Sequence, residues 1–237
     1  MTVIKKTIIV LAIFLVTPIV ALCLNWDWDP NSLNNFSEYL FWITESAGAP
    51  WGTLTCVFFF VLFCVLLKLK IKKQIFQVWV LLVAAVLVGQ GVKSAIKNYA
   101  GESRPFVLWM EKEHEVDDDY FYSLPRVERE ELIEEHIAHL NEIPDWLVEH
   151  WQNETGYSFP SGHTMFATTW AFLALVLLGF RRHHISVSII IAWAIVIEIS
   201  RLALGMHHPI DLILGAILSW LIAIACYFCA KKWHIVE

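Results

Sequence analysis

Six long apolar blocks constrain the fold of this chain more than any other feature. Blocks of this length are typical of helices that cross the roughly 30 Å hydrocarbon core of a bilayer. Lipid offers no hydrogen-bond partner to the backbone, so a block that crosses it has to be helical. The chain has 237 residues, of which 57% are hydrophobic, and this share exceeds that of a typical soluble domain. The blocks cover about residues 7–24, 52–69, 74–95, 163–180, 185–203 and 211–230.

These blocks predict an all-α integral membrane bundle of six transmembrane helices, organised as a single domain over residues 1–237. The first block follows a basic start, and we expect it to be retained as a signal-anchor helix instead of being cleaved. The segment Leu33–Glu45 is rich in aromatic residues and predicts a short helix at the membrane interface.

The longest polar segment, about residues 101–158, predicts a helical extramembrane cap. Apolar residues recur near helical spacing from 127 to 140, and Pro144 can open a second short helix. The acidic run 111–119 is expected to be a solvated loop. Four histidines of this segment receive no site role, because nothing near them in the sequence completes a site: His114, His136, His139 and His150.

The distribution of Lys and Arg predicts the orientation of the bundle. If six spans alternate, every short basic segment falls on one side, whereas residues 25–50 on the other side contain no Lys or Arg. By the positive-inside rule both termini are then cytoplasmic, and the cap lies on the outer face. The basic positions are Lys5, Lys6, Lys68, Lys70, Lys72, Lys73, Arg181, Arg182, Lys231 and Lys232.

The cysteines argue against a disulfide framework. All five lie in apolar blocks and none lies in the predicted outer segment. Cys226 and Cys229 have CxxC spacing, but they are surrounded by apolar residues in the middle of a predicted span. We therefore expect them to pack as small apolar side chains.

The segment 157–163, directly before the fourth apolar block, predicts an anion site. Pro160, Ser161 and Gly162 form a short turn that puts His163 at the start of the following helix. The first N–H groups of a helix lack internal partners and lie at the positive end of its dipole, so they attract phosphate. A histidine at this position can pass a proton to a leaving group.

Basic residues follow the third block. Lys97 and Arg104 are separated by Gly101, which can end the helix and let the chain turn back, so that the two side chains meet. Lys supplies a mobile point charge, and Arg supplies a planar fork that fits phosphate oxygens. For either residue alone, the alternative is an ordinary basic side chain that snorkels to the membrane surface.

A third polar cluster follows the fifth block. It contains Arg201, His207 and Asp211, and Asp211 lies one helical turn after His207. A carboxylate at this spacing is well placed to hold one imidazole nitrogen and leave the other free to react. Glu198 lies one turn before Arg201, and we expect the two to form an internal ion pair.

The predicted orientation puts all three clusters at one membrane face. Three cationic side chains and a helix N-terminus make a site for a dianionic phosphate. Two histidines supply the nucleophile and the acid that displacement at phosphorus needs. These residues include no set with clear metal-ligand spacing, so Lys and Arg are expected to supply the charge that a metal supplies in many phosphatases. The candidate residues are Lys97, Arg104, Ser161, Gly162, His163, Arg201, His207 and Asp211.

Three motifs resemble, in order and spacing, the signature motifs of the type 2 phosphatidic acid phosphatases. They are Lys97-x6-Arg104-Pro105, Pro160-Ser161-Gly162-His163 and Ser200-Arg201-x5-His207-x3-Asp211. The motifs cover residues 97–211, and the six-helix layout extends the resemblance to the whole chain. The stretches 89–94 and 154–159 further resemble the bacterial phosphatidylglycerophosphatase B group of this family.

The resemblance implies a role for each site residue. His207 would be the nucleophile that forms a phosphohistidine, and Asp211 would orient it. His163 would protonate the leaving alkoxide and then activate a water molecule. The family is metal-independent, so no metal or other cofactor is expected. The phosphate oxygens would be bound by Lys97, Arg104, Arg201, Ser161 and the backbone N–H of Gly162.

The resemblance also implies a substrate and a location. The expected reaction converts phosphatidylglycerophosphate to phosphatidylglycerol and phosphate, and phosphatidic acid, lysophosphatidic acid and diacylglycerol pyrophosphate are further expected substrates. The enzyme would lie in the bacterial inner membrane with its site on the periplasmic side, and neither a nucleic-acid partner nor an obligate protein partner is expected.

Two alternatives remain open at the level of the sequence. The same chemistry could act mainly on undecaprenyl pyrophosphate in carrier-lipid recycling. A protein of another class, a transporter or lipid-binding protein, could use the basic cluster only to hold an anion. That alternative gives no reason for two histidines and an aspartate at i+4 from one of them.

Overall fold

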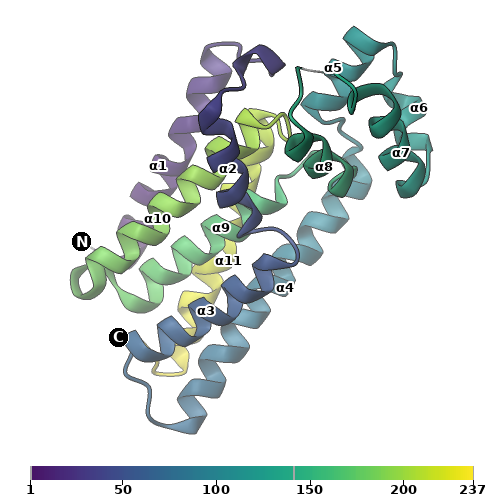
Figure 1. Ribbon diagram of the computed structural model, residues 1–237. Coiled ribbons are helices and arrows are strands. Elements are labelled where there is room, and N and C mark those ends of the chain that lie inside the picture. The colour runs from purple at the N-terminus through teal and green to yellow at the C-terminus, as the bar shows by residue number, and fades with distance from the viewer. Residues whose placement is uncertain (1, 141, 237) are drawn as a thin grey trace.

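The computed structural model describes residues 2–140 and 142–236 (Figure 1). Residues 1, 141 and 237 lie outside the described residues. All three belong to the predicted domain, and residue 141 also belongs to the predicted cap. The described part is 78% helix and holds no strand, so the predicted all-α class is confirmed. Its elements are α1 (Val3–Cys23), η1 (Pro30–Ser32), α2 (Asn35–Glu45), α3 (Trp51–Leu66), α4 (Lys72–Ala100), α5 (Pro105–His114), α6 (Asp118–Ser123), α7 (Arg126–Ile137), α8 (Asp145–Asn153), α9 (Gly162–Leu173), η2 (Ala174–Leu178), α10 (Phe180–Ala203) and α11 (Pro209–Lys232).

All six predicted apolar blocks lie on helices. Four segments are long and apolar enough to cross a membrane: α1, α10, α11 and the stretch Lys72–His114 that contains α4. The remaining blocks form the shorter apolar helices α3 and α9–η2. The lengths and composition of these helices are those of a membrane protein, while the number of spans stays a prediction.

Helix α9 lies at the centre of the bundle, packed against α10, α11 and α4 (Figure 1). Every residue from Thr164 to Leu173 is buried. Small residues let α11 approach closely, since a Cβ added at Gly215 would lie only 3.3 Å from the carbonyl oxygen of Ser161. This packing holds the N-terminus of α9 deep inside the molecule, beside the first turn of α11.

The short helices α5 to α8 gather at one end of the bundle, and both chain termini lie at the opposite end (Figure 1). Their common core is aromatic: Phe106 of α5 stacks on Trp151 of α8 with ring centroids 4.7 Å apart. The indole N–H of Trp151 donates to the carbonyl of Leu204, 3.0 Å away, in the loop between α10 and α11. The short helices are therefore fixed to the loop that carries His207.

A second indole packs against the same loop. Trp28 lies so close to Gly205 that a Cβ at Gly205 would be 2.8 Å from its ring. Gly205 also has a φ of +70°, a backbone conformation that residues with a Cβ atom rarely adopt. The end of α10 therefore depends on glycine at this position for two reasons.

The local predictions for the polar segments are mostly confirmed. The helix expected at Leu33–Glu45 is α2, and those expected after residue 127 and after Pro144 are α7 and α8. The solvated loop expected at residues 111–119 is wrong for most of its length, because α5 continues to His114 and α6 starts at Asp118. Pro105 opens α5, and its buried residues Phe106 and Met110 hold the helix against the core despite the acidic end.

Candidate active site

His207 and Asp211 form a buried pair between α10 and α11. Pro209 occupies the first turn of α11, which starts the helix directly after the loop and puts Asp211 one turn from His207. His207 Nδ1 lies 2.9 Å from Asp211 Oδ2, and the two side chains are 1% and 0% exposed. An ionised carboxylate only accepts hydrogen bonds, so this contact places the imidazole proton on Nδ1 and leaves the lone pair on Nε2.

Asp211 is itself held by several donors. Its Oδ2 accepts hydrogen bonds from the hydroxyl of Ser158 and, at 3.0 Å, from the backbone N–H of His208. The backbone N–H of Ser161 donates to the carbonyl of Asp211 at 3.2 Å. The carboxylate is thus fixed from the segment before α9 and from its own helix, and it fixes the imidazole in turn.

The environment of His207 keeps its imidazole neutral. Burial lowers the pKa of His207, and the positive charges of Arg104 and Arg201 lower this pKa further, well below its ordinary value. A neutral imidazole with a free Nε2 is the form that acts as a nucleophile or a base.

Arg104 lies beside His207 and is buried. Its guanidinium donates to two carbonyls, that of Gly156 at 2.6 Å and that of Met206 at 2.9 Å. Its Nη1 is 3.5 Å from His207 Nε2, the nitrogen that carries the lone pair. The backbone carbonyls therefore aim the guanidinium at the reactive side of His207.

Arg201, in the last turn of α10, is completely buried. The predicted ion pair with Glu198 is wrong: both carboxylate oxygens of Glu198 are buried without a hydrogen-bond partner among the described residues. Arg201 pairs instead with Glu154, at 2.8 Å from Nη2 to Oε2. Its Nη1 lies 3.3 Å from Thr44 Oγ1 and 3.1 Å from His150 Nε2. These three partners of Arg201 all lie outside α10.

Lys97, Ser161 and Gly162 surround the start of α9. The ammonium of Lys97, near the end of α4, donates to the carbonyls of Tyr157 and Ser158, the latter at 3.2 Å. Ser161 caps α9, where its Oγ accepts from the N–H of Thr164 at 3.3 Å. A Cβ at Gly162 would lie 2.8 Å from Lys93 Cδ, so a larger residue there would have to displace the Lys93 side chain.

His163 faces Glu154. Its Nε2 is 3.4 Å from Glu154 Oε1, without hydrogen-bond geometry, and this buried nitrogen has no hydrogen-bond partner in the described part of the chain. Burial by itself raises the pKa of Glu154, but the charges of Arg201, His163, His150 and Arg104 outweigh burial and lower this pKa well below its usual range. Glu154 is therefore an ionised carboxylate among cationic groups.

One cavity of about 1090 Å³ joins these groups. The polar part of its wall includes Lys97, Arg104, Glu154, His163 and His207, and Gly162 lies on the wall as well. The rest of the wall mixes apolar side chains, among them Phe41, Trp42, Val86 and Phe166, with polar ones such as Glu45, Lys93 and Glu149. The cavity thus combines charged groups with apolar surface.

The structure brings all eight predicted site residues to one region around the start of α9. Five of them line the cavity, and the other three lie directly behind its wall: Ser161, Arg201 and Asp211.

Sequence reasoning missed three residues that complete this region, Glu154, His150 and Ser158. Two signals were available. Glu154 lies in the short polar stretch just before the helix turn, where three cationic residues were predicted to meet. His150 lies four residues before Glu154, a spacing that joins neighbours on a helix.

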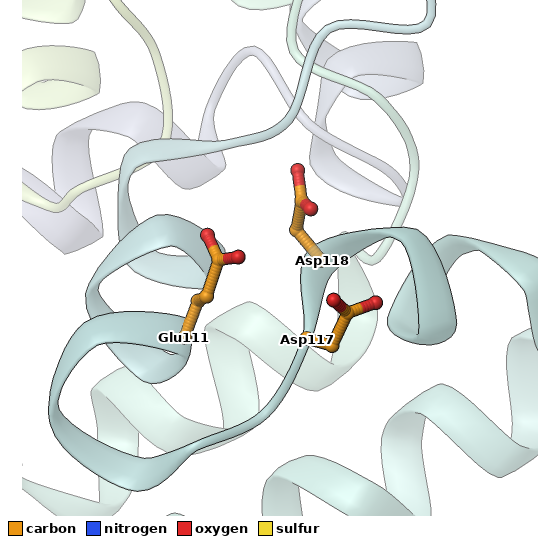
Figure 2. Close-up of side chains that lie close together, drawn as sticks. All are labelled: Glu111, Asp117 and Asp118. Carbon is orange, nitrogen blue, oxygen red and sulfur yellow. The ribbon is translucent and has the colours of Figure 1, made fainter.

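Three carboxylates outside this region come together at the junction of α5 and α6. One carboxylate oxygen from each of Glu111, Asp117 and Asp118 lies within 4.8 Å of the other two. Figure 2 shows the three side chains close together. Asp117 Oδ1 accepts from the N–H of Tyr120 at 2.7 Å and caps α6, while Asp118 Oδ2 accepts from Ser103 Oγ at 2.7 Å. Two of the three therefore have structural partners, and the group lies on the exposed surface.

The region around this cavity contains two guanidinium groups, an ammonium, a helix N-terminus and two imidazoles. This combination makes a site for phosphoryl chemistry. The helical fold and this site define a membrane-embedded class of phosphate-processing proteins.

Comparison with known proteins agrees with this class. The PAP2 superfamily pattern matches residues 78–235. Phosphatidylglycerophosphatase B of Escherichia coli (strain K12) is 43% identical over 228 residues, which cover 96% of this chain and 89% of that protein. Phosphatidylglycerophosphatase B of Haemophilus influenzae is 37% identical over 215 residues, 88% of each chain. A lipid A 4'-phosphatase of Bacteroides thetaiotaomicron is 35% identical over 77 residues, about a third of each chain.

This chain belongs to the PAP2 superfamily, and it is a phosphatase.

Proposed function

We propose that this chain hydrolyses phosphatidylglycerophosphate to phosphatidylglycerol and inorganic phosphate. One observation carries the proposal: His207, with Nδ1 bound to Asp211, presents Nε2 beside Arg104 on the cavity that His163 also lines. Two relatives that cover most of the chain bear the name of this activity. The apolar side chains of the cavity wall suit the lipid part of such a substrate.

The first step transfers the phosphoryl group to the enzyme. His207 Nε2 attacks phosphorus, the bond from phosphorus to the lipid oxygen breaks, and a phosphohistidine forms. His163 gives its proton to the departing alkoxide. Asp211 holds the Nδ1 proton and stabilises the charge that develops on the imidazole of His207.

The second step releases phosphate. A water molecule loses a proton to His163 and attacks phosphorus, and the bond to His207 Nε2 breaks. In both steps the phosphate oxygens would be bound by Arg104, Arg201 and Lys97, together with Ser161 and the backbone N–H of Gly162. These groups stabilise the negative charge that spreads over the oxygens in the transition state.

The arrangement in the membrane is part of the same proposal. The chain is a single domain of six spans, with α5 to α8 as the cap on the periplasmic side of a bacterial inner membrane. This orientation is supported by the basic residues between the predicted spans. It agrees with the position of both termini at the end of the bundle opposite α5 to α8 (Figure 1).

A panel of lipid phosphates tests the proposed substrate. Purified protein in detergent, and again in bilayers, is assayed in excess chelator against phosphatidylglycerophosphate, phosphatidic acid, lysophosphatidic acid, diacylglycerol pyrophosphate and undecaprenyl pyrophosphate. We expect turnover of all five, with the highest kcat/KM for phosphatidylglycerophosphate. The His207→Ala variant, purified in the same way, is the control for contaminating phosphatase activity.

Two outcomes of this panel would contradict the proposal. A higher kcat/KM for undecaprenyl pyrophosphate would assign the chain to carrier-lipid recycling. Loss of activity in chelator that only a divalent ion restores would contradict the role of Lys97, Arg104 and Arg201 as the source of positive charge.

A further inference from the structure

Glu154 occupies the place where a phosphate is expected to bind. Its Oε2 lies 2.8 Å from Arg201 Nη2 and 3.4 Å from Arg104 Nη2. Its Oε1 lies 3.4 Å from His163 Nε2. The two oxygens of one carboxylate therefore meet both guanidinium groups and the imidazole nitrogen that the proposed mechanism uses. A phosphoryl group bound by the same three side chains would collide with Glu154, so the carboxylate has to leave when the substrate enters.

The cationic groups do not depend on Glu154 for their positions. Arg104 is held by the carbonyls of Gly156 and Met206. Arg201 has contacts to Thr44 and His150 at its other nitrogen. Withdrawal of the carboxylate would thus leave two guanidinium groups in place, each with a nitrogen free for a phosphate oxygen.

Glu154 is also less tightly held than Asp211, the other carboxylate of the site. Asp211 is completely buried and lies within a helix, and Oδ2 receives hydrogen bonds from three groups. The Glu154 side chain is 22% exposed, lines the cavity, and follows the last turn of α8 with a backbone outside the helical region. The surroundings of Asp211 hold it in place, whereas those of Glu154 allow a ligand to replace it.

The charge of Glu154 favours one kind of ligand. A phosphate monoester is a dianion, whereas the phosphodiester of an ordinary membrane phospholipid carries one negative charge. A diester that replaced Glu154 would only exchange one negative charge for another, and it would compete with a tethered carboxylate at high effective concentration. A dianion brings one more negative charge to the two guanidinium groups, so they attract it more strongly than they attract the carboxylate.

We propose that Glu154 is a tethered anion that occupies the phosphate subsite and selects dianionic phosphate monoesters over the phosphodiesters of surrounding lipids. This inference rests on the proposed function, since it takes Arg104, Arg201 and His163 as the phosphate subsite. Glu154 thereby determines specificity without taking part in bond formation. The product lipid, a diester, does not displace it.

Binding of two small probes to the folded protein tests the inference. Inorganic phosphate serves as the dianion, at about pH 8, and dimethyl phosphate serves as the diester monoanion. Their apparent Kd values are measured from the shift in thermal unfolding of the detergent-purified protein, and again from inhibition of hydrolysis of a short-chain substrate. The variants are Glu154→Gln, which removes the charge with little change in shape, and Glu135→Gln, the same change at an exposed position on α7 that does not line the cavity.

We expect wild-type protein to bind inorganic phosphate, with dimethyl phosphate binding at least about tenfold weaker. In Glu154→Gln both probes should bind at least about tenfold more tightly. This variant should unfold at lower temperature without ligand, because two buried guanidinium groups lose their carboxylate, and phosphate should restore its stability. Glu135→Gln should match the wild type.

The possible failures are distinguishable. If inorganic phosphate neither stabilises nor inhibits the wild type, the subsite and with it the proposed function are wrong. If it does both, but folded Glu154→Gln binds neither probe more tightly, only the role of Glu154 is wrong. Should Glu154→Gln not fold, Glu154→Asp keeps the charge and shortens its reach. Tighter phosphate binding by that variant supports the inference, and wild-type affinity overturns it.

Discussion

The two histidines of the site are held in different ways. His207 belongs to a side formed by Asp211 and Ser158, here called the fixed side, in which a completely buried carboxylate is held by three donors. His163 belongs to a side formed by Glu154, Arg201 and His150, here called the exchange side. There a partly exposed carboxylate on the cavity wall pairs directly with Arg201 and lies beside His163 and His150. The comparison indicates that one side is built to orient a nucleophile and the other to give up an internal ligand for an external one.

The largest expected loss of activity comes from a substitution on the fixed side. Asp211→Asn removes the acceptor that holds the Nδ1 proton of His207, so the imidazole can adopt the unproductive tautomer. We expect kcat for phosphate release to fall on the order of 10³-fold while the protein stays folded. Steady-state kinetics on a soluble short-chain substrate measures this.

The corresponding change on the exchange side provides the contrast. Glu154→Gln is expected to keep kcat within about tenfold of wild type and to lower KM, because it removes a competitor instead of a catalytic group. Asp145→Asn, at an exposed position on α8, serves as the control for loss of a carboxylate. Equal losses of kcat in Asp211→Asn and Glu154→Gln would contradict the division into two sides.

A smaller effect concerns the protonation of His207. Burial and the charges of Arg104 and Arg201 lower its pKa well below the ordinary value of about 6.5, so lowering the pH to that value should leave it neutral. Histidine-selective ¹⁵N spectra of wild type and His207→Gln identify its signal. We expect the His207 signal to remain that of a neutral ring at about pH 6. A midpoint near 6.5 for His207 would show that the arginines do not act on it as described.

The same division separates what the sequence could predict from what it could not. The apolar blocks predicted the helices, because their length and composition leave little choice of secondary structure. The pair of His207 and Asp211 followed from a spacing of four residues at a helix start. These inferences depend on local spacing or on the solvent that surrounds the segment, and both can be read from the chain.

The exchange side depends on tertiary contacts, and for this reason sequence reasoning missed it. Arg201 was predicted to pair with Glu198, three residues away, but it pairs with Glu154, which is 47 positions away in the chain. Ser158 reaches Asp211 over 53 positions. Spacing within one helix favoured the nearer acid, whereas the packing of α8 and the following loop against the end of α10 determined the actual partner.

Trapping of a phosphorylated enzyme tests the central claim most directly. The protein is mixed with substrate that carries ³²P in its terminal phosphate, quenched in denaturant within the first turnovers, and digested. We predict an acid-labile, base-stable label on the peptide that contains His207, which is absent from His207→Gln and accumulates when His163 is replaced by Gln. Rapid phosphate release by wild-type protein without any label on this peptide, or undiminished release by His207→Gln, would contradict the account.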